Sequence, residues 1–382
     1  KDLERYTYRI RSGAKENVEE GEYQSRSAVF SRGTFSNLLN SEWLSVQAGY
    51  ELTLEEGSGS SVAIVIDPEE GTVTQNLDNY DFFAASEMQL TDRFSLRPGA
   101  RVSFSNLFDT QYIGSLSAKQ TLGEDWELRA IVGSANRTPN YNELYTYFVD
   151  VNHNVQGNGD LTPEQGVSTF LHIKKRSSLA DGAVRLKNKI SFNYLNLQDR
   201  IELIVVNQSP LAYQYNNIDS YKAMGVFSEN ELYYQNIKAQ LGASVQGISK
   251  VLDSRTNSND DFLYNFQLNA NVAYTVPKWD TTFSLFFKHI GEQQQFVEKT
   301  NAEGNQEFFT GKTEAYSWLD TTINKLFFDG ALITTLGARN IFDVTAVNTT
   351  AFEGGTHNGP PTQIPLGYGR SYFLKLTYHL TL

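Results

Sequence analysis

The sequence contains no cysteine and only five histidines in 382 residues. The absence of cysteine excludes a disulfide framework and thiolate metal sites. No stretch approaches the roughly 18 consecutive apolar residues that a membrane-spanning helix requires. The N-terminal segment "KDLERYTYRIRSG" also lacks the apolar core of a signal peptide. Taken alone, these absences are typical of a soluble protein.

The charge balance and the missing motifs exclude further classes of protein. Acidic residues outnumber basic ones and give a formal net charge of −12, which argues against a nucleic-acid partner. The sequence has no H-E-x-x-H motif, no P-loop, no G-x-S-x-G elbow and no Rossmann glycine pattern. A histidine-based catalytic site would have to be assembled from distant parts of the chain. We therefore predict that the protein is not an enzyme.

Aromatic residues and period-two alternation dominate what remains. Segments of roughly 10 to 16 residues alternate apolar and polar side chains, which indicates strands with one apolar and one polar face. The clearest segment runs from Phe262 to Val276, where Asn265, Gln267 and Asn269 lie on the polar face. The apolar face carries Phe262, Tyr264, Phe266, Leu268, Ala270, Val272, Tyr274 and Val276.

The connections between these segments alternate in length. Tight turns such as Gly123-Glu124 and Gln235-Asn236 alternate with connections that are mostly longer. The longer connections span about 56–77, 138–164, 251–260, 291–312 and 341–369. The pattern predicts roughly 16 strands, the first of them near 2–14, 22–35 and 42–55, with less regular strands at 313–327 and 331–340.

Two all-β architectures fit an alternating pattern. In a soluble sandwich or propeller the apolar face is core, whereas in a membrane barrel it faces lipid. Soluble strands average about five or six residues, and these segments are about twice as long. Ten or more tilted residues cross a bilayer, and long loops at one end with tight turns at the other are typical of outer-membrane barrels. We therefore predict a transmembrane antiparallel β-barrel.

Four sequence motifs resemble those of TonB-dependent outer-membrane receptors. They are "NRTPNYNELY" (136–145), "GNGDLTPE" (157–164), "LGARNIFDVT" (336–345) and "GYGRSYFLKLTYHLTL" (367–382). The sequence departs from the family pattern at several positions. Asn136 and Thr138 stand where the family usually has an aromatic residue and alanine, Gly159 replaces a proline, and the last residue is Leu382 instead of an aromatic.

The resemblance implies an architecture and a location. Receptors of this family have a 22-stranded barrel preceded by a globular plug, so residues 1–382 are expected to be the C-terminal part of the barrel domain, without the plug and about six strands. The resemblance further implies the outer membrane of a Gram-negative bacterium, with outer-membrane lipid around the barrel. The TonB contact is expected to be made through the missing N-terminal part.

The resemblance also implies active uptake of a scarce metal-containing nutrient. An iron chelate (a siderophore) or haem is favoured as cargo, cobalamin is an alternative, and no intrinsic cofactor is expected. The motif residues are interpreted mainly as structural anchors, because proline stops strand pairing and asparagine and aspartate support turns. These residues are Arg137, Pro139, Asn142, Glu143, Leu144, Asn158, Asp160, Leu161, Pro163 and Glu164.

His153 is the first candidate for a ligand contact. It lies between the first two motifs, where haem-uptake members of the family place a ligand histidine, and imidazole is a usual axial ligand of haem iron. The alternative is an ordinary solvated loop histidine, and His357 is a weaker candidate of the same kind. Aromatic residues nearby could stack against a porphyrin or bind a chelate. These are Tyr141, Tyr145, Tyr147 and Phe148.

Two other functions stay open at this point. The strand count fits a passive 16-stranded porin, whereas the paired motifs and long loops favour the receptor. A barrel that serves as a surface binding module for a lipoprotein or peptide partner is the third possibility. The remaining histidines, His172, His289 and His379, fall in predicted strands and are expected to be structural.

Overall fold

The computed structural model describes nine ranges of the chain. They are residues 7–8, 15–16, 25–58, 74–149, 153–208, 210–253, 260–300, 306–350 and 363–379. Within these ranges no helix has the length and apolar character needed to cross a membrane.

Long β-strands make up most of the described chain. They are β3 (Ser25–Asn40), β4 (Leu44–Ser58), β5 (Thr74–Thr91), β6 (Phe94–Ser105), β7 (Gln111–Leu122), β8 (Trp126–Ser134), β11 (Gln165–Leu179), β12 (Val184–Gln208), β13 (Leu211–Tyr234), β14 (Ile237–Val251), β15 (Leu263–Val276), β16 (Thr281–Ile290), β19 (Tyr316–Phe327), β20 (Leu332–Arg339) and β23 (Ser371–Tyr378).

The remaining elements are short and lie mostly in the connections. They are β1 (Thr7–Tyr8), β2 (Lys15–Glu16), α1 (Tyr141–Tyr145), β9 (Tyr147–Val149), β10 (Asn154–Gln156), the 3-10 helix η1 (Pro277–Trp279), β17 (Gln293–Thr300), β18 (Gln306–Thr313), β21 (Ala346–Asn348) and β22 (Gln363–Pro365).

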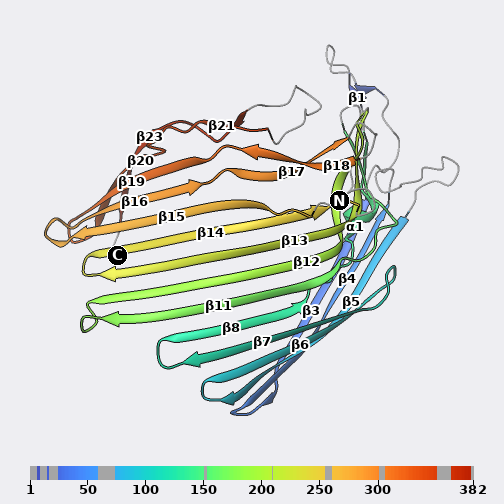
Figure 1. Ribbon diagram of the computed structural model, residues 1–382, viewed down its shortest axis with the longest axis horizontal. Coiled ribbons are helices and arrows are strands. Elements are labelled where there is room, and N and C mark those ends of the chain that lie inside the picture. The colour runs from blue at the N-terminus through green and yellow to red at the C-terminus, as the bar shows by residue number, and fades with distance from the viewer. Residues whose placement is uncertain are drawn as a thin grey trace.

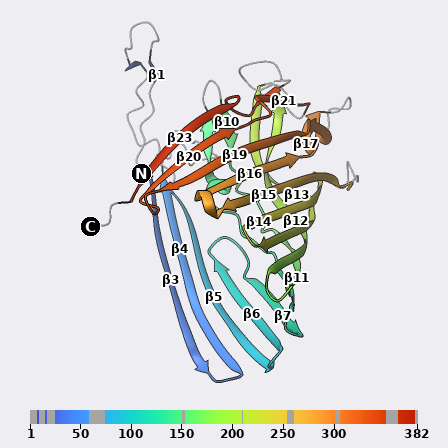
Figure 2. The same ribbon diagram turned by 90° about the vertical axis from the view of Figure 1, so that its left-hand side faces the viewer.

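The long strands form one antiparallel sheet in which neighbours in sequence are neighbours in space. The order is β3 to β8, then β11 to β16, then β19, β20 and β23. Tight turns join the strands at one end, which we call the short-turn end, and the longer connections lie at the opposite long-loop end (Figure 1). Seen from the short-turn end, the strands form a strongly curved wall (Figure 2). This arrangement confirms the predicted antiparallel barrel fold.

The first and the last of the long strands run in the same direction. β3 and β23 are neighbours in the strand order, and each runs from the long-loop end to the short-turn end. No residue-by-residue register between them is found within the described residues. The predicted strand at 2–14 falls largely outside these residues, where only β1 and β2 are described and pair with each other. The last long strand, β23, pairs with β20.

Strand β15 shows the predicted division into two faces. Tyr264, Phe266, Val272 and Tyr274 point outward and keep 48%, 40%, 41% and 47% of their surface exposed, so no second sheet covers them within the part of the chain that the structure describes. The alternate residues, among them Asn269, point to the inside of the curved wall. This is the side-chain arrangement of a barrel wall whose outer face contacts lipid.

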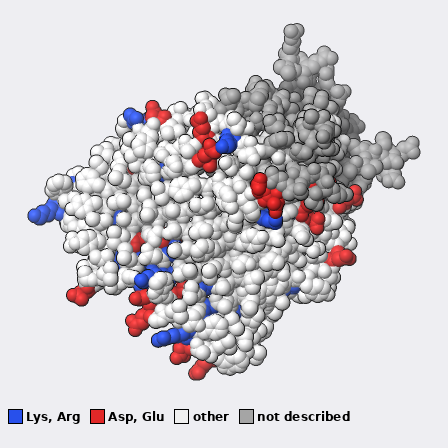
Figure 3. All heavy atoms as spheres, in the orientation of Figure 1, with Lys and Arg blue, Asp and Glu red and all other residues white. Residues whose placement is uncertain are grey.

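The outward face of the wall carries little charge. Figure 3 shows this face of the central strands as largely uncharged, with most of the visible charged side chains toward its ends. Large apolar residues stay exposed along the whole series of strands, for example Phe82, Leu285 and Leu374 at 52%, 50% and 61%. Such a surface is stable in lipid, where exposed apolar side chains cost nothing and every backbone polar group must be paired within the protein.

The start of the last long connection is fixed by a buried asparagine. Asn340 is only 1% exposed and adopts a left-handed backbone with φ of 51°. Its amide side chain donates to the Val344 carbonyl at 2.9 Å and accepts from the Val344 N–H at 3.0 Å, while its own N–H donates to Asp320 at 2.7 Å. Asp343 in turn accepts from the Arg370 N–H at 2.7 Å. This hydrogen bond joins the start of the last long connection to its end.

We predict that a charge introduced on the outward face of β15 lowers the stability of the protein more than a charge introduced on the inward face. Arginine in place of outward-facing Leu268 would place a cation in lipid and is expected to lower the free energy of unfolding by about 2 to 4 kcal/mol. The same change at inward-facing Asn269 is the matched control and is expected to cost less than about 1 kcal/mol. Urea unfolding in liposomes, followed by tryptophan fluorescence, measures both. Equal losses at the two positions would contradict the assigned faces.

Candidate functional site

The connection between β8 and β11 is a folded structure at the long-loop end. Its short helix α1 begins at Asn140, whose side chain accepts hydrogen bonds from the N–H groups of Asn142 and Glu143 at 3.0 and 3.1 Å. The Glu143 carboxylate accepts from the Asn140 N–H at 2.8 Å, which completes a capping box. These hydrogen bonds give acceptors to N–H groups that have no partner within the helix at its start.

An ion network ties the two motifs of this loop together. Arg137 donates to Glu143 at 2.8 Å and also to Glu164, and the backbones of Arg137 and Glu164 exchange two hydrogen bonds. Glu164 additionally accepts from the Ile201 N–H at 3.0 Å. Burial lowers the pKa of the Arg137 guanidinium, but the hydrogen bonds that it donates to both carboxylates outweigh this effect and raise the pKa overall. The network therefore holds the base of the loop against β12.

The loop also reaches β3, β4 and β5. Tyr141 is 2% exposed, and its hydroxyl donates to the Gln75 carbonyl at 3.2 Å. The Arg26 guanidinium lies 4.7 Å from its ring centroid, and a Cβ at Gly57 would collide with its hydroxyl. Burial raises the pKa of Tyr141 to about 12. An apolar cluster surrounds it: Leu77, Leu144, Tyr145, Leu161 and Ile201.

This packing differs from the prediction for two of the aromatic residues. Tyr141 and Tyr145 were expected to face a ligand, but both are buried, and their rings pack edge to face at 5.0 Å between centroids. Their role in this structure is to fix the loop. Tyr147 is half-buried, whereas Phe148 and His153 are exposed with ring centroids 4.9 Å apart. His357 lies outside the described residues.

The other motif residues fit the anchoring role. Pro139 and Leu161 are buried. Asn158 donates to Asn216 at 3.1 Å and accepts from the Asp160 N–H at 2.9 Å, so it joins the loop to β13 and forms a local turn. Of the strand histidines, His172 and His289 each contact a serine hydroxyl at 2.9 Å, which is consistent with a structural role.

A cluster of charged and aromatic side chains lies beside this loop. We call Arg200, Glu202, Tyr221 and Lys250 the mouth cluster. The Arg200 guanidinium lies 3.5 Å from the Tyr221 ring centroid and 3.2 Å from Glu202, and Lys250 donates to Glu202 at 2.6 Å. The cluster therefore carries two cations and one carboxylate around an aromatic face. Arg200 and Tyr221 also line a cavity of 290 Å³ together with Arg137 and Glu164.

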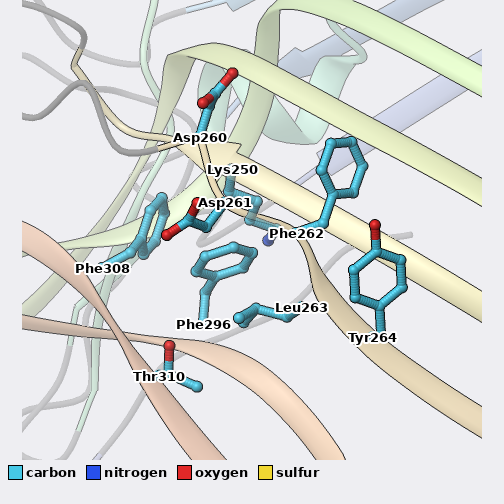
Figure 4. A pocket seen from close by; sticks show the side chains of 9 residues that line it. All are labelled: Lys250, Asp260, Asp261, Phe262, Leu263, Tyr264, Phe296, Phe308 and Thr310. Atoms are coloured by element: carbon cyan, nitrogen blue, oxygen red, sulfur yellow. The ribbon is translucent and has the colours of Figure 1, made fainter.

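A larger cavity of 640 Å³ opens on the other side of Lys250. Figure 4 shows Lys250, Asp261, Phe296 and Phe308 gathered on one side of it. The two phenyl rings lie 5.5 Å apart, and the Lys250 ammonium is 5.9 Å from the Phe308 centroid. Further lining residues are Asp260, Phe262, Leu263, Tyr264 and Thr310. The lining therefore combines several aromatic faces with one cation, Lys250, and two carboxylates, Asp260 and Asp261.

The sequence analysis did not identify the mouth cluster. Arg200, Tyr221 and Lys250 come from three different strands: the register pairs Tyr221 with Lys250, whereas Arg200 is paired with Ile218 and contacts Tyr221 through its side chain. The available signal was the position of Tyr221 on the polar face of a long strand, where an aromatic side chain has no lipid to contact. Within the described residues no group of three histidine, aspartate or glutamate side chains is placed to hold a metal ion.

Comparison with known proteins gives a family and a fold. The family described as "TonB dependent receptor-like, beta-barrel" matches residues 4–341. Comparison with curated sequences finds no match. Among solved structures, the siderophore receptor PirA from Acinetobacter baumannii superimposes with a TM-score of 0.69 at 17% identity, covering 97% of this chain and 57% of PirA.

Two further structures are similar. A mutant of the ferric enterobactin receptor PfeA from Pseudomonas aeruginosa, in complex with enterobactin, has a TM-score of 0.67 at 17% identity over 94% of this chain and 55% of that one. The iron transporter FrpB from Neisseria meningitidis has a TM-score of 0.65 at 13% identity over 93% and 55%. The chain thus spans little more than half the length of each of these three proteins.

The ion network predicts a local effect of removing its cation. Replacing Arg137 with alanine leaves Glu143 and Glu164 without their shared partner, and hydrogen bonds to charged groups contribute about 1.5 to 3 kcal/mol each. We expect amide hydrogen exchange in the loop 136–164 to accelerate by about tenfold or more, while exchange in β14 and β15 stays unchanged. Lys278→Ala, in a tight turn, is the control. Unchanged exchange in the loop would show that the network does not hold it.

Proposed function

The chain belongs to the TonB-dependent receptor β-barrel family, and from that premise we propose that it forms the wall of an outer-membrane receptor that imports an iron chelate. The cargo is an anionic chelate with aromatic iron-binding groups. TonB, acting through a part of the protein outside these 382 residues, supplies the energy for release. The location that follows is the outer membrane of a Gram-negative bacterium, with lipid around the outward face of the wall.

The observation that carries this proposal is the mouth cluster. Arg200 and Lys250 place two cations around Tyr221, and only Glu202 among these four residues opposes them. Guanidinium and ammonium groups beside an aromatic ring attract an anionic aromatic chelate by ion pairing and by stacking. The adjacent cavity of 640 Å³ offers the aromatic faces of Phe296 and Phe308 for stacking, and its charged lining is Lys250 with Asp260 and Asp261. Solved structures of similar fold are siderophore and iron receptors, which supports the same class of cargo.

Uptake of radioactive iron tests the proposal directly. Cells without their own receptors, expressing the full-length protein, are expected to accumulate ⁵⁵Fe from a ferric tris-catecholate only when TonB and the proton-motive force are intact. Accumulation that continues without TonB, and that extends to a neutral sugar of similar size, would contradict active import and indicate a passive pore.

The mouth cluster is tested with a double substitution. Arg200→Gln together with Lys250→Gln keeps the side chains polar but removes both cations, and we expect binding of the ferric catecholate to weaken by about tenfold to a hundredfold. Lys278→Gln together with Lys325→Gln removes two cations elsewhere and serves as the matched control. Equal affinities of the two double variants would exclude the mouth cluster as the binding site.

Haem is the alternative cargo, and it gives His153 a specific role. The side chain is exposed beside Phe148, so an imidazole could reach an iron brought by a porphyrin. If haem is the cargo, the unaltered protein is expected to shift the Soret absorbance of haem. His153→Ala should remove that shift while leaving the barrel assembled, since the residue lies in a loop. An absent shift in the unaltered protein, or the same shift in the variant, would remove His153 from the site.

A further inference from the structure

Lys250 separates two groups of charged side chains at the long-loop end of the wall. On one side lies the mouth cluster, where the two cations Arg200 and Lys250 and the one carboxylate Glu202 leave a net positive charge. On the other side lies the cavity of 640 Å³, where the one cation Lys250 and the two carboxylates Asp260 and Asp261 leave a net negative charge. The two sides of Lys250 therefore differ in the sign of their charge.

The strand register places Asp261 next to Lys250. Tyr221 is paired with Lys250, and Ile248 is paired with Leu263. Lys250 and Asp261 each lie two residues from the second pair, toward the long-loop end, so the two residues lie side by side on neighbouring segments of the chain. Tyr221, Lys250 and Asp261 thus follow one another across the wall.

Asp261 is the carboxylate that faces the aromatic lining of the cavity. Figure 4 shows its oxygens beside the rings of Phe296 and Phe308, whereas the carboxylate of Asp260 points away from both rings. Asp260 accepts a hydrogen bond from Lys222 at 2.8 Å. The cavity thus presents the Asp261 carboxylate together with two phenyl rings whose centroids lie 5.5 Å apart.

A carboxylate beside aromatic faces is suited to binding an organic cation. The face of an aromatic ring is electronegative and attracts an ammonium or guanidinium group within about 6 Å of the ring centroid. The ammonium of Lys250 lies 5.9 Å from the Phe308 centroid, but it donates its hydrogen bond to Glu202 at 2.6 Å, on the other side. The attraction of the Asp261 carboxylate adds to that of the rings, so the cavity favours a cation brought by a ligand.

One ligand can reach both sides of Lys250. Neighbouring strands lie about 4.8 Å apart, so Asp261 is roughly 10 Å from the centre of the mouth cluster at Tyr221. A flexible arm attached to a chelate at the mouth cluster can span that distance and enter the cavity. The two contacts then act on one molecule, and the second contact does not have to overcome the entropy cost of a separate binding event.

We propose that the cavity is a subsite for a cationic arm of the cargo, so that the cargo is an anionic ferric chelate that also carries a protonated amine. The iron-binding groups lie at the mouth cluster, and the amine lies between Asp261 and the rings of Phe296 and Phe308. This inference rests on the proposed function, because it requires that the chelate binds at the mouth cluster. It adds the feature by which the protein distinguishes one chelate from another, namely the charge of the arm.

Two synthetic ferric tris-catecholates test the inference, one with an aminopentyl arm and one with a hydroxypentyl arm. The protonated amine makes the chelate less negative, so the mouth cluster alone would bind the aminopentyl chelate equally well or more weakly. We expect the unaltered full-length protein in detergent to bind it about fivefold more tightly than the hydroxypentyl chelate. Quenching of tryptophan fluorescence by the ferric chelate measures both affinities, and added salt should reduce the preference.

Substitutions of Asp261 test where the amine binds. Asp261→Asn keeps the shape of the side chain but removes its charge, so the ratio of the two affinities is expected to fall below about twofold. Asp261→Glu should retain the preference. Asp181→Asn removes an exposed carboxylate in the turn between β11 and β12 and is the matched control, which should also retain it. Arg200→Gln should weaken binding of both chelates by a similar factor, because it changes the mouth cluster only.

The contrary outcomes separate this inference from the proposed function. If the hydroxypentyl chelate binds and the aminopentyl chelate binds no more tightly, the cationic subsite is wrong and the proposed class of cargo stands. If neither chelate binds, the proposed function fails and the subsite with it. A preference that Asp261→Asn leaves intact would also overturn the subsite, because the amine would then bind elsewhere. The comparison of the two chelates needs no variant, so it decides the question even where a variant does not fold.

Discussion

The pairing of backbone groups between neighbouring strands is the interaction on which the rest of this structure depends. A membrane interior offers no water to the backbone, so each N–H and C=O must find its partner in the next strand. The ladders meet this requirement, as in the pairing of β12 with β13 that begins at Val184 and Tyr234. Once the ladders are fixed, the two-residue period decides which side chains contact lipid and which face inward.

This constraint leaves the candidate functional residues at the long-loop end of the wall. The middle inward row of β11 to β13 is uncharged, and the mouth cluster lies on its long-loop side. The loop 136–164 adds the apolar cluster around Tyr141 and Leu144, which fixes the geometry of the long-loop end. The wall therefore acts as a rigid frame, and the chemistry that distinguishes this protein lies where the strands leave the membrane.

The sequence predicted the wall better than it predicted the site. Alternation in 262–276 identified the faces of β15 correctly, because the period of side chains in a strand is a local property. The burial of Tyr141 was not predicted, since it depends on Gly57 and Leu77, which are distant in sequence. The helix α1 had a local signal that was not used, namely the capping box formed by Asn140 and Glu143. The role of His153 in cargo binding stays a prediction.

The alternation of lipid-facing and inward-facing side chains is the central claim, and cysteine scanning measures it most directly. Because the chain has no cysteine, single cysteines placed in turn at positions 264 to 274 can be labelled in membranes with a water-soluble maleimide. We predict that labelling alternates with a period of two: strong at 265, 267 and 269, and weak at 264, 266 and 268. Labelling that is uniform, or that is strong at the aromatic positions, would contradict the barrel wall.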